Sequence, residues 1–145
     1  MIDQVFDIAN TLALVGWIGL LASPFIPRVS ALVSGLLIPL ALSFGYVVVI
    51  AMSFGQAEGG FDTLENVMLL FDDPAVALGG WVHFLAFDLL IGAWIVKNAR
   101  ENGIPFWMVL PCLPLTFLFG PAGWLLYQLI SQTRSRLGPT ATAAP

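Results

Sequence analysis

The chain has 145 residues, of which 59% are hydrophobic and only 10% are charged, and its mean hydropathy is +0.92. Soluble domains carry roughly 25% charged residues, so this composition is typical of an integral membrane protein. The length suits a single domain. The net charge of -4 and the five scattered Lys and Arg residues argue against a nucleic-acid partner, because binding phosphates requires clustered basic side chains.

A membrane core about 30 Å thick needs roughly 20 apolar residues in a helix. Taken in chain order, segments of that length occupy residues 5–23, 30–54, 74–99 and 105–130. The third has a clear start, with Asp73 as a predicted N-cap and Pro74 at the first helical position. The sequence therefore predicts an all-α integral membrane protein, a bundle of four transmembrane helices that forms one domain over residues 1–136.

Two shorter segments complete the predicted organisation. Apolar residues recur with helical spacing over residues 61–72, with acidic residues between them. This pattern predicts a short amphipathic helix in the membrane interface between spans two and three, and an ordinary surface loop is the alternative. Residues 137–145 are small and polar, and we expect them to be a disordered tail.

The basic residues bear on orientation, because Lys and Arg favour the cytoplasmic side of a membrane. Four spans would place Arg28, Lys97 and Arg100 on one side and Arg134 and Arg136 on the other. This count favours an orientation with both termini outside the cytoplasm. The first apolar run follows Asp3 rather than a basic region, so we expect a retained span and a bacterial inner-membrane location, not a secretory signal or a transit peptide.

The third predicted span contains two ionisable residues, His83 and Asp88. An Asp at the membrane centre costs about 2.5–3.5 kcal/mol on insertion scales, so such groups are candidates for function. They are five residues apart, about 140° around a helix, so they do not share a stripe, whereas Trp81 and Asp88 do. His83 must then find its partner on another helix, and Asn10, Tyr46 and Tyr127 are among the candidates. A hydrogen bond that only fixes helix packing is the alternative role.

The first and fourth spans supply further candidate residues. Asn10 and Trp17 lie on one face of the first helix, seven residues apart. The fourth span is interrupted by several prolines and by Gly120-Pro121, which predicts a helix that curves around a ligand pocket. The single cysteine, Cys112, is read as a small hydrophobic residue. Because no nucleotide, zinc or nucleophile motif is present, we predict no metal and no cofactor.

Two runs carry a family resemblance: Trp-Val-His-Phe-Leu-Ala-Phe-Asp-Leu from Trp81 to Leu89, and Leu-Phe-Gly-Pro-Ala-Gly from Leu118 to Gly123. They resemble the abscisic-acid-deficient-four family of small membrane proteins. Its plant members are required for making neoxanthin from violaxanthin. The resemblance implies a carotenoid or another long apolar ligand in the surrounding lipid, and it implies roles for these residues: Trp81, His83, Asp88, Pro121 and Gly123.

The chemistry that the resemblance implies is an isomerisation of a carotenoid epoxide to an allenic alcohol, which needs one acid and one base and no redox cofactor. In this hypothesis Asp88 is the acid and His83 is the base, and both are catalytic. Trp81 and Trp17 pack against the polyene, and Asn10, Pro121 and Gly123 complete the substrate-binding set. The alternative is a non-catalytic accessory that binds carotenoid or lipid. The oligomeric state stays open.

Overall fold

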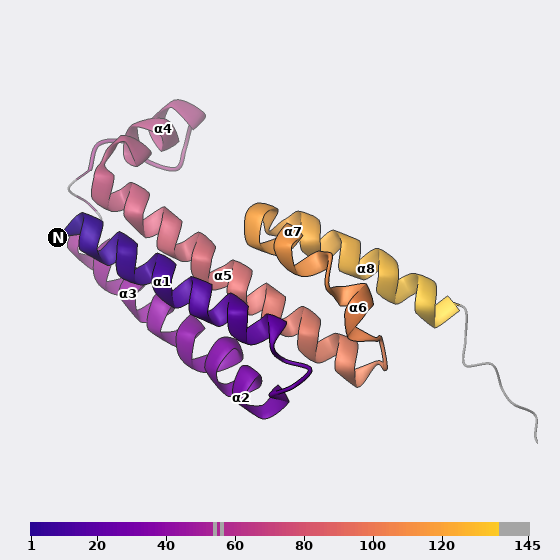
Figure 1. Cartoon of the computed structure of the whole chain (residues 1–145). Coiled ribbons are helices and arrows are strands. Elements are labelled where there is room, and N and C mark those ends of the chain that lie inside the picture. The colour runs from indigo at the N-terminus through magenta and orange to yellow at the C-terminus, as the bar shows by residue number, and fades with distance from the viewer. Residues whose placement is uncertain (54, 56, 137–145) are drawn as a thin grey trace, which may run out of the picture.

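The computed structural model describes residues 1–53, 55 and 57–136, and every regular element within these ranges is a helix (Figure 1). Three helical segments are long and apolar enough to cross a membrane. They are α1 (Ile2–Leu21), the continuous segment Pro27–Ser53, and α5 (Pro74–Glu101). The second consists of α2 (Pro27–Leu32), the π-helix η1 (Val33–Leu37) and α3 (Ile38–Ser53). The prediction of an all-α protein is confirmed for the described residues, and three helical segments of membrane-spanning length and hydropathy are consistent with the predicted membrane class.

The predicted fourth span, residues 105–130, is divided into α6 (Phe106–Val109), α7 (Cys112–Phe119) and α8 (Pro121–Arg136). Figure 1 shows α7 and α8 as a helical hairpin beside the second half of α5. Its turn lies at Gly120, which adopts φ +40°, a backbone conformation that only glycine reaches without strain. The four-span count is therefore not confirmed, because this segment turns back halfway along α5.

The hairpin also determines at which end of the bundle the last helix, α8, finishes. Gly120 lies beside Asp88, in the middle of α5, whereas Tyr127 lies beside Asn98, near the end of α5. α8 therefore runs in the same direction as α5 and finishes at the end of the bundle opposite the N-terminus (Figure 1). The predicted orientation with both termini on one side is not supported, since it assumed that residues 105–130 cross the membrane.

α5 forms the centre of the bundle and contacts α1, α3 and α7. Small residues allow these contacts to be close. A Cβ added at Gly92 would lie 2.7 Å from the Trp17 ring, and one at Gly16 would lie 2.5 Å from the Leu89 side chain. Both ring and side chain are buried, so α1 and α5 pack against each other through glycine on each side.

The start of α5 follows the sequence prediction, and the helix continues to Glu101, two residues beyond the predicted end. Asp73 is the N-cap, and its carboxylate accepts hydrogen bonds from the backbone N–H groups of Ala75 (2.8 Å) and Val76 (3.1 Å). Gly103 follows the helix with φ +63°. These contacts satisfy backbone groups that a helix end leaves without partners.

The amphipathic segment is helical over α4 (Leu64–Asp72), three residues shorter than predicted at its start. Thr63 is its N-cap, and the Thr63 hydroxyl accepts a hydrogen bond from the Asn66 backbone N–H at 3.2 Å. Its position in a membrane interface stays a prediction. The predicted disordered tail, residues 137–145, lies outside the described residues.

The π-helix η1 has a cause in the sequence. Pro39 has no N–H to donate to the carbonyl of Gly35, one turn earlier, and its ring crowds that carbonyl. The preceding turn widens instead, and the backbone N–H of Ile38 donates to the carbonyl of Val33, five residues back. Pro39 therefore stays inside a continuous helix at the expense of one wide turn, a feature that often marks functional regions.

Candidate functional site

Asp88 is a buried carboxyl in the middle of α5, with 6% of its surface exposed. A Cβ added at Gly120 would lie 2.6 Å from Asp88 Oδ1, so the carboxyl group is packed directly against the turn of the hairpin. Its second oxygen, Oδ2, is buried and has no hydrogen-bond partner among the described residues. A buried carboxyl with an unsatisfied oxygen is costly, and this makes Asp88 the strongest candidate for a functional group.

The turn at Gly120 is built by backbone hydrogen bonds and by proline. The Gly120 N–H donates to the Thr116 carbonyl at 2.8 Å, and the Gly123 N–H donates to the Gly120 carbonyl at 3.2 Å. Pro121 occupies the first position of α8, where its missing N–H costs nothing. The positive end of the α8 dipole therefore lies next to the Asp88 carboxyl.

Gly123 holds the two arms of the hairpin together. A Cβ added there would overlap the Thr116 hydroxyl and the backbone of α7. Gly123 is buried within this contact, and Pro121 is exposed. Both were predicted to bind substrate; the structure places them in the hairpin, where Pro121 starts α8 and Gly123 permits close packing.

Trp81 and Asn10 join α5 to α1. The indole Nε1–H of Trp81 donates to Asn10 Oδ1 at 3.0 Å. Phe6 and Phe84 flank the indole, with ring centroids 6.0 Å and 5.5 Å away. Two of the predicted substrate-binding residues are therefore direct partners.

Two apolar cavities lie along α1, and the first of them adjoins the hydrogen-bonded pair of Trp81 and Asn10. The Trp81 cavity, of about 350 Å³, lies between α1, α5 and the tip of α7, and its lining includes Asn10, Trp81, Phe84, Leu85 and Phe117. The Trp17 cavity, of about 330 Å³, lies between α1 and α7, and its lining includes Trp17, Leu21, Pro114 and Phe117. Leu14 and Phe117 line both, so the two cavities are neighbours along α1, and together we call them the groove along α1.

Trp17 forms the inner wall of the Trp17 cavity. It is 5% exposed and packs edge-on against Phe117, with the ring centroids 5.5 Å apart. Its indole N–H is buried and has no acceptor among the described residues. The predicted substrate-binding residues Asn10, Trp17 and Trp81 thus lie along one groove.

Asp88 adjoins this groove from two directions. Along α5 it follows Phe84 by four residues and Leu85 by three, and these spacings place it one turn further on the same face. Along α7 its neighbour Gly120 comes two residues after Leu118, which also lines the Trp81 cavity. Asp88 therefore lies one helical turn from residues that line the Trp81 cavity, although it does not itself line that cavity.

His83 lies on another face of α5, toward α3. Its ring is 4.5 Å from the Phe87 ring and 5.4 Å from the Tyr46 ring, measured between centroids. Tyr46, one of the partners that the sequence left open, is in contact with His83. The predicted acid and base, Asp88 and His83, are not brought together, and this agrees with their angular separation on the helix.

Sequence reasoning missed the neighbour of Asp88. Gly120 was read only as a bend, although a Gly-Pro pair within an apolar segment is also a strong turn signal. The described residues contain no group of three His, Cys, Asp or Glu side chains placed to hold a metal ion. The site is therefore one carboxyl group, a hairpin turn and an aromatic groove.

The fold and this site define a class: small helical membrane proteins with a buried carboxyl beside a helical hairpin. The profile of the ABA4-like family, described as ABA DEFICIENT 4-like, matches residues 4–127. The chain belongs to this family, and the resemblance seen in the sequence is confirmed. No solved structure matches the chain.

Proposed function

We propose that this protein binds a carotenoid in the groove along α1 and isomerises its epoxide end group at Asp88. The observation that carries the proposal is the buried Asp88 carboxyl, which has an unpartnered oxygen and lies one helical turn from Phe84 and Leu85 of the apolar Trp81 cavity. Membership of the ABA4-like family is consistent with a carotenoid-related role. The groove follows α1 from Asn10 to Leu21, about 16 Å at 1.5 Å per residue, enough for an end ring and part of a polyene.

In the proposed reaction Asp88 serves as both acid and base. The protonated carboxyl donates its proton to the epoxide oxygen as the carbon–oxygen bond opens. The resulting carboxylate removes a proton from the adjacent polyene carbon, and the electron pair of that C–H bond forms the allene. Substrate and product are isomers, so no oxidant or reductant is needed. The first turn of α8 stabilises the carboxylate between the two steps.

This proposal changes the role expected of His83. Because the imidazole packs on Tyr46 and Phe87, away from Asp88, one carboxyl is a simpler catalyst than the His83–Asp88 pair. His83 then connects α5 to α3. Trp81 and Trp17 keep their proposed contacts with the ring and the polyene.

The test is expression in bacteria that make an epoxide carotenoid, followed by chromatography of the pigments. We expect an allenic isomer with the wild-type chain, none with Asp88→Asn, and an undiminished amount with His83→Gln, at equal protein levels. Asp88→Asn is nearly isosteric, so a change in product reflects the lost proton. Product that persists in Asp88→Asn and disappears in His83→Gln would refute the assignment.

A non-catalytic carotenoid-binding accessory is the second candidate. It is favoured by the close approach of Asp88 to Gly120, the residue before α8, because a carboxyl at a helix start also serves stability. In that case unchanged pigment copurifies with the wild-type chain and no isomer forms. If no pigment copurifies and no product appears, both candidates fail.

We also infer an orientation from the charges. Arg28, Lys97, Arg100 and Arg134 all lie at the end of the bundle where α8 finishes, and α8 ends at Arg136. Most acidic residues lie at the other end or in the segment that leads to α5: Asp3, Asp7, Glu58, Asp62, Glu65, Asp72 and Asp73. The basic end then faces the cytoplasm and the N-terminus faces outward. In a bacterial inner membrane, a C-terminal green fluorescent protein should fluoresce, and a C-terminal alkaline phosphatase should be inactive.

A further inference from the structure

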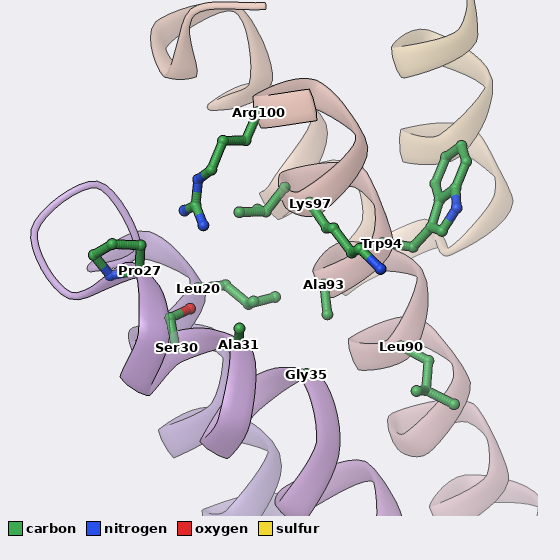
Figure 2. A pocket seen from close by; sticks show the side chains of 11 residues that line it. Leu20, Pro27, Ser30, Ala31, Gly35, Leu90, Ala93, Trp94, Lys97 and Arg100 are labelled. Atoms are coloured by element: carbon green, nitrogen blue, oxygen red, sulfur yellow. The ribbon is translucent and has the colours of Figure 1, made fainter. Parts of the chain in front are cut away.

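A third cavity lies at the basic end of the bundle, apart from the groove along α1. It has a volume of about 430 Å³ and opens between the α2–η1 segment and the second half of α5 (Figure 2). Ala31, Gly35 and Ala93 line it. Because these residues are small, the two helices enclose free space between them. The Gly35 position belongs to the π-helix, so the wide turn upstream of Pro39 forms part of the wall.

The cavity has a cationic mouth and an apolar floor. Lys97 and Arg100 line one end, the buried Leu20 lies at the floor, and the exposed Leu90 lies at the other end (Figure 2). Positions 90, 93, 97 and 100 lie on one face of α5. The first two side chains along this face are apolar and the last two are basic. Figure 2 shows the Arg100 guanidinium extending across the opening toward Pro27 and Ser30.

The charge at the mouth is only partly balanced. Lys97 forms an ion pair with Glu101 at 3.9 Å, and both side chains are largely exposed, so the pair is weak. Arg100 donates to the Ser23 carbonyl at 3.3 Å and forms no ion pair with a carboxylate in the described part of the chain. Arg28 adds a further positive charge to the same end of the second helical segment.

We propose that this cavity binds an anionic phospholipid, with its phosphate between Lys97 and Arg100 and one acyl chain against Leu20 and Leu90. Basic pockets between membrane helices on the cytoplasmic side suit such headgroups, because each Lys or Arg near the surface strengthens anion binding. A free anion would occupy only the basic end of the cavity and leave its apolar part empty. An amphiphile fills both the basic end and the apolar part, so we expect a lipid and not a free anion. Trp94, at the side of the cavity, has the amphipathic ring that favours the headgroup level.

The experiment uses the purified full chain in detergent, with native mass spectrometry after addition of equal amounts of phosphatidylglycerol and phosphatidylcholine. We expect phosphatidylglycerol to bind preferentially. The preference should fall about five-fold for each charge removed in Lys97→Gln and Arg100→Gln. Arg100→Lys should retain most of it. Arg134→Gln is the matched control, because Arg134 lies at the same end of the bundle and outside this cavity, and we expect it to have no effect.

A second variant tests the apolar part. Ala31 lines the cavity and is exposed, so Ala31→Phe fills the space without entering the core. It should lower phosphatidylglycerol occupancy while both cations remain. Equal binding of the two lipids, or an equal loss in Arg134→Gln, would overturn the proposal. Displacement of the lipid by millimolar inorganic phosphate would also overturn it, in favour of a free anion.

Discussion

Replacing Gly120 by alanine tests whether the hairpin turn and Asp88 form one unit. Gly120 has φ +40° and ψ −93°, outside the left-handed α region, and an L-residue in such a sparsely populated conformation costs roughly 1–3 kcal/mol. The new Cβ would also lie 2.6 Å from Asp88 Oδ1, and forcing that side chain off its rotamer adds about 0.5–1.5 kcal/mol. The expected total is a loss of about 1.5–4.5 kcal/mol in the free energy of unfolding.

Gly103→Ala is the matched control. Gly103 also has a positive φ, +63°, but an added Cβ would meet nothing within 4 Å, so this variant measures the strain alone. Unfolding is followed by circular dichroism in mixed micelles with an increasing fraction of dodecyl sulfate. The double variant Gly120→Ala/Asp88→Ala should cost about 0.5–1.5 kcal/mol less than the sum of its single variants, because the contact is gone. Equal losses in the two alanine variants, with no coupling to Asp88, would refute the reasoning.

Three further predictions concern the packing of the hairpin, a hydrogen bond and the pKa of Asp62. Gly123→Ala should separate the hairpin arms and cost about 1–3 kcal/mol in the same unfolding assay; an unchanged stability would contradict the close contact. Tyr127→Phe removes the 2.7 Å hydrogen bond from the Tyr127 hydroxyl to Asn98 Oδ1 and should cost about 0.5–1.5 kcal/mol, with no loss expected if that bond is absent in the membrane. The hydrogen bond from the Asn66 side chain lowers the pKa of Asp62, so Asn66→Ala should raise that pKa in an NMR titration. The associated stabilisation of α4 is present above the unfolded pKa and is lost as the pH falls through the lowered value.

Residues whose partners are close in sequence were predictable. Asp73 caps α5 because its carboxylate reaches N–H groups two and three residues later. The angular separation of His83 and Asp88 follows from helix geometry alone, and the structure agrees with it. The pairing of Trp81 with Asn10 was not predictable, because 71 residues separate them and several polar residues on other helices were equally available.

Composition, hydropathy and the runs around Trp81 and Gly120 determined by themselves that this is an all-helical membrane protein of the ABA4-like family. They identified Asp88 as a residue whose burial needs an explanation. Tertiary structure alone decided that residues 105–130 turn back at Gly120, that Asp88 faces that turn, and that the basic residues gather at one end. The physical reason is that hydropathy measures the length of an apolar segment, whereas one backbone angle at Gly120 decides whether that segment crosses the membrane or returns.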